Sequence, residues 1–92
     1  MTTLKSRDVT TGLKRKGFEE RKGSHLFFIL YVDGKKTCIQ TMVSHGMREI
    51  GDSLISKMAR QTKLNSKGFV DLVTCPLSRE AYIAELRKQG AL

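Results

Sequence analysis

The chain has 92 residues, of which 39% are hydrophobic and 28% are charged. This composition is typical of a single globular domain and argues against a largely disordered chain. The 17 lysines and arginines outnumber the 9 acidic residues, and the net charge of +8 favours a polyanionic partner such as nucleic acid, or an acidic protein. No apolar run approaches the roughly 20 residues of a membrane helix. Residues 1–17 also have no apolar signal-peptide core, so we expect a cytoplasmic protein without membrane contact.

The N-terminal part of the chain predicts a short helix followed by a short strand. Ser6 is expected to cap a helix over residues 7–16, and Gly17 follows as the residue that ends it. Basic side chains close the last turn of this helix, where they suit the helix dipole. Residues 18–21 predict a brief strand, and residues 22–23 predict a turn.

The clearest pattern in the sequence is a β-hairpin. Residues 25–32 are rich in aromatic and β-branched side chains, which are typical of a strand. Asp33 and Gly34 are typical of a two-residue type I′ turn, because glycine adopts positive φ without strain. Residues 36–43 are the returning strand.

Three helices are expected in the second half of the chain. Asp52 is expected to cap the first, which ends near Lys63, and Ser66 is expected to cap the second. Ser78 is expected to cap the last, over residues 79–88.

The order α-β-β-β-α, followed by a helical tail, predicts an α+β fold. We expect a three-stranded antiparallel sheet with the helices on one face. Residues 1–64 form the expected core, and residues 65–92 form a C-terminal helical extension of the same domain.

The hairpin turn predicts the strand register and the place of the two histidines. Pairing Val32 with Lys35 puts His25 opposite Met42, and His45 lies just beyond the end of the returning strand. Both histidines should therefore lie at one edge of the sheet. Alternation divides the strand into an expected core face (Leu26, Phe28, Leu30 and Val32) and a face partly open to solvent or to a partner (His25, Phe27, Ile29 and Tyr31).

His25 has three readings from the sequence: a packed or capping side chain, a metal ligand, or an acid–base group. Cys38, Cys75, His25 and His45 would supply four zinc ligands by type, but the cysteines lack a short paired spacing. We therefore expect reduced thiols and no metal or other cofactor.

Two segments carry motifs that occur together, and in the same order, in one known protein family. In LKSRDVTTGLKRKGFEERKGSHLFF (residues 4–28), a short helix and a glycine-aromatic pair precede Gly-Ser-His at the start of a strand. In SHGMREIGDSLISKMARQTKL (residues 44–64), a histidine, a Glu-apolar pair and a glycine precede a helix. Together the two segments resemble HicA-type mRNA interferase toxins. The resemblance implies a dsRBD-like fold (that of double-stranded-RNA-binding domains), a ribonuclease that cleaves mRNA, and a HicB-like antitoxin as protein partner.

The resemblance also implies roles for individual residues. His25 matches the catalytic histidine, Gly23 and Ser24 match the residues that present it, and His45 is its candidate acid–base partner. Histidine exchanges protons near neutral pH, as RNA cleavage through the 2′-hydroxyl requires. Arg21, Lys22 and Arg48 could stabilise the developing charge. The candidate RNA-binding residues cluster early in the chain: Lys5, Arg7, Lys14, Arg15, Lys16, Arg21, Lys22, Gly23 and Ser24.

Other functions stay open at this point. A non-catalytic RNA-binding module on the same fold has the same charge, and a toxin-derived protein could retain partner binding alone. Phe27 and Tyr31 could stack on bases or contact a partner or the tail. The apolar tail residues need burial, for which a homodimer is one solution (Phe69, Val70, Leu77 and Tyr82).

Overall fold

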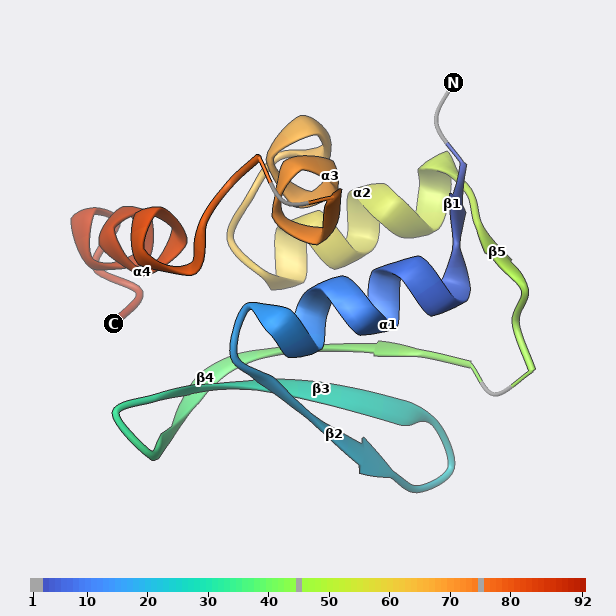
Figure 1. Ribbon diagram of the computed structural model, residues 1–92, viewed down its shortest axis with the longest axis horizontal. Coiled ribbons are helices and arrows are strands. Elements are labelled where there is room, and N and C mark those ends of the chain that lie inside the picture. Colours follow the sequence, from blue (N-terminus) through green and yellow to red (C-terminus); the bar gives the residue numbers. More distant parts are fainter. Residues whose placement is uncertain (1–2, 45, 75) are drawn as a thin grey trace.

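The computed structural model describes residues 3–44, 46–74 and 76–92 and has the expected α+β architecture. Strands β2, β3 and β4 form an antiparallel sheet in that order, and two short strands, β1 and β5, pair separately (Figure 1). The elements are β1 (Leu4–Lys5), α1 (Ser6–Arg15), β2 (Phe18–Lys22), β3 (Leu26–Val32), β4 (Lys35–Val43), β5 (Glu49–Ile50), α2 (Asp52–Gln61), α3 (Ser66–Thr74) and α4 (Arg79–Lys88).

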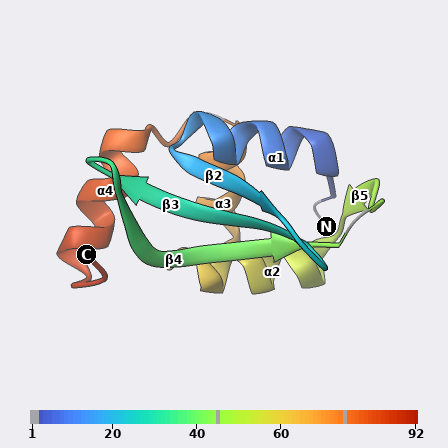
Figure 2. The same cartoon turned by 90° about the horizontal axis from the view of Figure 1, so that it is seen from below.

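The helices lie on one side of the sheet. Figure 1 shows α1, α2 and α3 above the strands and α4 beside the end that carries the β3–β4 turn. Seen from below, the strands face the viewer with no helix in front of them (Figure 2). Among the helices of the described residues, none has the length and apolar character needed to span a bilayer.

The inner face of β3 is apolar and packs against the core, as its alternation predicts. Phe28 and Leu30 are both 0% exposed, and Leu26 and Val32 pack at the margin of the same core. Helices and strands contribute jointly to this core, whose buried residues are Val9, Leu13, Phe18, Phe28, Leu30, Ile39, Val43, Ile50, Ile55, Met58, Ala59, Phe69, Leu72, Val73, Tyr82 and Leu86.

The type I′ turn is confirmed, but the register predicted for the far end of the hairpin is wrong. Asp33 and Gly34 have φ of 54° and 76°, and Val32 pairs with Lys35. A bulge then shifts the pairing, so that Met42 lies opposite Phe27 and not opposite His25.

A threonine side chain stabilises this bulge. The Thr37 hydroxyl donates to the carbonyl of Leu30 at 2.8 Å and accepts from the amide of Ile39 at 3.2 Å, replacing regular ladder bonds. Because the shift is two residues, the side chains keep the faces that alternation assigns to them.

The first two predicted helix caps are wrong by one residue. Helix α1 starts at Ser6, which does not cap it. The Ser6 amide donates to the carbonyl of Arg48 at 2.8 Å, next to the β1–β5 pair. Helix α2 likewise starts at Asp52, with Gly51 in the capping position.

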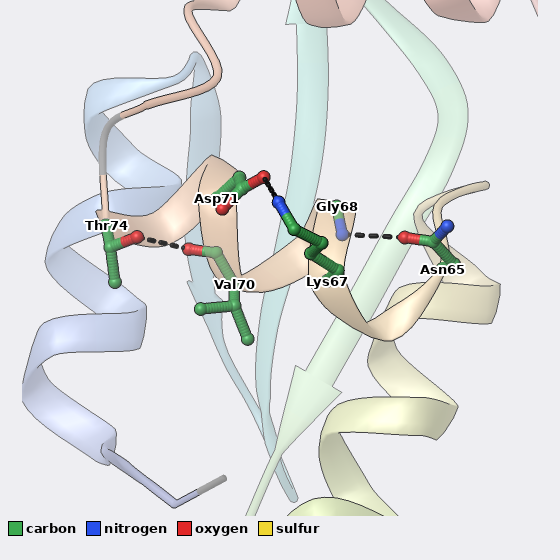
Figure 3. Close-up of polar contacts among 6 residues, drawn as sticks. All are labelled: Asn65, Lys67, Gly68, Val70, Asp71 and Thr74. Carbon is green, nitrogen blue, oxygen red and sulfur yellow. Dashed lines mark hydrogen bonds and ion pairs between the residues drawn. The ribbon is translucent and has the colours of Figure 1, made fainter.

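Helix α3 is capped by Asn65 and not by Ser66, whereas the predicted cap of α4 is confirmed. The Asn65 side-chain oxygen accepts from the Gly68 amide at 2.7 Å (Figure 3). At α4, the Ser78 hydroxyl oxygen accepts from the amide of Ala81 at 3.1 Å.

The C-terminal segment is part of the core. Phe69 and Tyr82 are fully buried within the chain, and Val70 and Leu77 pack against the same cluster. The Tyr82 hydroxyl donates to the carbonyl of Thr62 at 2.8 Å, and burial raises the pKa of Tyr82 far above its ordinary value. These apolar side chains therefore need no second copy of the chain for burial.

Lys16 is a buried cation that ties α1 to the C-terminal segment. It is only 7% exposed, and its Nζ donates to the carbonyls of Leu72 and Leu77 at 2.6 and 2.7 Å. Leu72 lies in the last turn of α3, where the helix dipole favours a positive charge. Lys16 thus has a structural role in this fold.

Candidate active site

His25 lies in the turn that joins β2 to β3, just before the strand in which the sequence pattern puts it. The ladder ends with Lys22 opposite Leu26, which leaves residues 23–25 as the connection. The Gly23 amide donates to the carbonyl of His25 at 3.0 Å and closes this turn. The imidazole is half-buried and tilted against the ring of Phe27, with ring centroids 6.3 Å apart.

The imidazole lines a small pocket at the end of the sheet remote from α4. The pocket has a volume of about 190 Å³ and lies between the end of β4 and one side of α2. Its lining combines one histidine, one lysine and several apolar or neutral side chains: His25, Met42, Val43, Ser44, Met47, Leu54, Lys57 and Gln61. A group that enters this pocket therefore meets an imidazole and an ammonium together.

Two further hollows adjoin the His25 pocket and share residues with it. The first, of about 680 Å³, shares Met47 and carries three cations, Lys5, Arg7 and Arg48, with two acids, Glu20 and Glu49, on its rim. The second, of about 580 Å³, shares Lys57 and Gln61 and adds Arg60 and Lys63. We call the six cations of these three hollows the basic track: Lys5, Arg7, Arg48, Lys57, Arg60 and Lys63.

His25 therefore lies between two groups of cations. Lys5 ends β1 and Arg7 lies in the first turn of α1, where the helix dipole adds positive potential. Lys57 and Arg60 belong to the second half of α2. A nucleic-acid backbone carries a phosphate on each nucleotide. Such a ligand can contact cations on both sides of His25 at the same time.

The structure divides the predicted RNA-binding residues among several places. Lys5 and Arg7 lie on the basic track, and Lys22, Gly23 and Ser24 are exposed at or beside the His25 turn. The remaining residues do not line the pocket of His25.

Those remaining residues are engaged elsewhere in the fold. Lys14 makes a 2.8 Å ion pair with Glu20, and Arg15 lines a separate hollow between α1 and α3. Arg21 lies on β2 and donates to a tyrosine on the outer face of the sheet. Lys16 is withdrawn into the core, so we leave it out of the surface proposed below.

The predicted partner histidine, His45, and one of the two cysteines, Cys75, lie outside the described residues. Within the described ranges, no three His, Cys, Asp or Glu side chains lie close enough to hold a metal ion. Cys38 is exposed and reduced.

Sequence reasoning missed the α2 side of the site. Leu54, Lys57 and Gln61 follow one another at i, i+3 and i+7, a spacing that brings side chains to one side of a helix. That spacing is the available signal, but it does not say which side of α2 faces the end of β4. Lys57 was therefore indistinguishable from a solvated lysine.

Comparisons with protein-family models, with curated proteins and with solved structures found no match. The resemblance to HicA-type toxins is thus a hypothesis that depends on the two segments in which its residues occur. The chemistry of the site has to be inferred from the imidazole, the ammonium of Lys57 and the basic track.

Proposed function

We propose that this protein is an endoribonuclease that cleaves mRNA, with His25 as its general acid or base. One observation carries the proposal: the half-buried imidazole lines a pocket with Lys57, between two hollows lined by cations. An imidazole held at a solvent-accessible rim beside positive charge has the properties that phosphodiester cleavage requires.

The proposed reaction uses the 2′-hydroxyl of the substrate as nucleophile. A bond forms between this oxygen and the adjacent phosphorus, and the bond from phosphorus to the 5′-oxygen breaks. One proton leaves the 2′-hydroxyl and one proton reaches the departing 5′-oxygen, giving a 2′,3′-cyclic phosphate and a 5′-hydroxyl. Neutral His25 can accept the first proton, or protonated His25 can supply the second.

Lys57 supplies the complementary charge in this scheme. The phosphorane formed during attack carries more negative charge than the substrate, and an ammonium in the same pocket stabilises that charge. The proposed chemistry needs no metal ion. Other cations of the basic track hold the flanking phosphates and so align the chain with His25.

The proposed biological role is that of a toxin in a HicAB-like toxin–antitoxin system. The resemblance of residues 4–28 and 44–64 supports this role, and it implies a HicB-like antitoxin that blocks cleavage. For an enzyme that acts on mRNA, we expect the activity in the cytoplasm.

Incubation of the purified protein with mRNA in excess EDTA tests the activity. Wild type should give products with cyclic phosphate and 5′-hydroxyl ends, and His25→Ala should reduce the rate by about 100-fold or more. Lys88→Ala, at an exposed residue of α4, is the matched control and should cleave as wild type does. Equal rates for wild type and His25→Ala would exclude the proposed role of His25.

A non-catalytic RNA-binding module is the second candidate function. The basic track favours it because the positive surface extends well beyond His25 and does not by itself require chemistry. RNA binding without cleavage by wild type would select this alternative. If the protein neither binds nor cleaves RNA, a toxin-derived protein that retains only antitoxin binding would be favoured.

A further inference from the structure

The outer face of the sheet carries a row of apolar and aromatic side chains that the proposed chemistry does not use. Phe27, Ile29 and Tyr31 alternate with the core residues Phe28 and Leu30 along β3 and therefore point away from the helices. Figures 1 and 2 show no helix over this side of the sheet. The row is thus a feature of the surface.

Neighbours on the same face, and not a covering element, bury the middle of this row. Ile29 is only 7% exposed, whereas Phe27 and Tyr31 on either side of it are half-buried. Its cross-strand partners are Glu19 and Gln40. The two aromatic rings are therefore the apolar parts of this face that a ligand can reach, about 13 Å apart along the strand.

Cations surround the two rings. Arg21, whose side chain is 58% exposed, lies opposite Phe27 and donates to the Tyr31 hydroxyl at 3.1 Å. Lys36 lies opposite Tyr31 on the other side. The one acid in this group of facing residues, Glu19, already pairs with Arg21 at 3.6 Å.

Aromatic rings framed by cations match the chemistry of single-stranded nucleic acid. Unpaired bases stack on aromatic side chains, while arginine and lysine hold the phosphates. A paired strand keeps its bases inside the duplex and cannot stack them in this way. An acidic protein would meet the cations but would have no particular need of two separated rings.

The outer face also leads to His25. The imidazole is in ring contact with Phe27 at the end of the row. Met42, opposite Phe27, lines the pocket that contains His25 and Lys57. A strand that lies along β3 therefore reaches the proposed cleavage site without crossing another element.

We propose that the outer face of the sheet binds single-stranded RNA through stacking of bases on Phe27 and Tyr31, and directs the strand to His25. The inference rests on the proposed function for its substrate, and it adds that this substrate is unpaired. Arg21 positions the Tyr31 ring through its hydroxyl and contributes a phosphate contact.

Binding is measured separately from cleavage by placing every variant on a His25→Ala background. Phe27→Leu and Tyr31→Leu keep an apolar cover over Ile29 but remove the aromatic ring. Each should weaken binding of a short single-stranded RNA about tenfold. Tyr31→Phe keeps the ring but removes the hydroxyl that Arg21 contacts, and it should weaken binding less than Tyr31→Leu does. Leu92→Ala, at an exposed residue outside the row, is the control for loss of an apolar side chain.

A duplex of the same sequence and a thermal melt complete the design. The background protein should bind the single strand more tightly than the duplex, and all variants should melt as the background does. Unchanged affinity of well-folded Phe27→Leu and Tyr31→Leu would overturn the inference even if wild type cleaves RNA. Ring-dependent binding without cleavage by wild type would support the inference and contradict the nuclease. If Phe27→Leu and Tyr31→Leu lose binding to a co-expressed protein but keep their affinity for RNA, this face docks a protein and the inference is overturned.

Discussion

The two faces of the same sheet differ in how their side chains are used. On the inner face, Phe28 and Leu30 are fully buried, and even the ammonium of Lys16 has two carbonyl partners. On the outer face and at the pocket end, His25 and Tyr31 are half-buried and border open hollows or solvent. Stability and function are therefore expected to depend on different residues of one strand.

The strand β3 offers the strongest test of this difference, because Phe27 and Phe28 are neighbours on opposite faces. Phe28→Ala should lower the free energy of unfolding by about 3–5 kcal/mol, through lost burial and a cavity. Phe27→Ala should cost roughly 1 kcal/mol, because its ring is only half-buried. Urea denaturation measures both, and equal losses would mean that the outer face is also structural.

The packing of α1 against α3, on the core side of the sheet, can be tested next. A Cβ on Gly12 would lie 2.7 Å from the Cα of Val73, which is backbone and cannot simply rotate away. Gly12→Ala should therefore destabilise the protein by about 2–3 kcal/mol, as the helices are forced apart. Gly51→Ala is the matched control, because a Cβ there meets nothing within 4 Å. A neutral Gly12→Ala would show that the two helices can separate freely.

Lys16 and Lys14 provide a third comparison, between a buried and an exposed cation on one helix. Lys16→Met keeps most of the side-chain volume but leaves the carbonyls of Leu72 and Leu77 without their donor. It should cost about 2 kcal/mol of unfolding free energy. Lys14→Met should cost far less. If Lys16→Met retains wild-type stability but weakens RNA binding, the assignment of Lys16 to the core would be wrong.

Much of the fold could be predicted because its elements have strong local patterns. The alternation from Leu26 to Val32 identifies the core face, and Asp33-Gly34 identifies the turn. Ser78 is followed by the helix that it caps. In each of these cases the residues that determine the structure are adjacent in the sequence.

The wrong predictions concern contacts between distant residues or between side chain and backbone. The bulge depends on the Thr37 hydroxyl, which replaces ladder bonds and leaves no trace in the hydrophobic pattern. The β1–β5 pair contains only two residues from each strand, too few to show a period. The burial of Lys16 depends on the carbonyls of α3 and the following loop, which are more than 50 residues away.

The candidate site was predictable only in its first half. Gly23, Ser24 and His25 form a motif, but Lys57 reaches the same pocket from another helix. Which side of α2 faces the sheet is decided by packing of the whole helix. The cluster of basic residues early in the sequence also predicted too large a contribution of α1 to RNA binding, since Lys14 and Lys16 are engaged within the fold.

Lys57 tests the solvent-accessible pocket end of the sheet, and we expect a smaller effect from its substitution. Lys57→Gln, on the His25→Ala background, should weaken RNA binding about tenfold at low salt and lower the salt-dependence slope by about one. Lys88→Gln removes an equal charge from α4 and should change neither quantity. Identical behaviour of the two variants would mean that net charge alone, and not the basic track, attracts RNA. Stability should be unchanged in both.

The Lys14–Glu20 ion pair should make the smallest contribution to stability among these tests. It lies at the boundary between the buried inner face and the solvent. The hydrogen bond from Lys14 lowers the pKa of Glu20 below its ordinary value, against a smaller opposing effect of burial. A carboxyl whose pKa is lower in the folded state stabilises the fold above its unfolded pKa, and this contribution is lost as the pH falls through the folded pKa. Because the pair is partly exposed and screened by water, we expect about 0.5 kcal/mol or less.

That small contribution can be isolated by its dependence on pH and salt. The difference in unfolding free energy between wild type and Lys14→Met should be present at neutral pH and shrink as the pH falls below the ordinary pKa of glutamate. It should also shrink at high salt, which screens exposed charges. A difference that persists when Glu20 is protonated would mean that Lys14 contributes through packing of its methylene chain. Packing on the core side of the sheet would then include the side chain of Lys14, beyond the buried residues of α1.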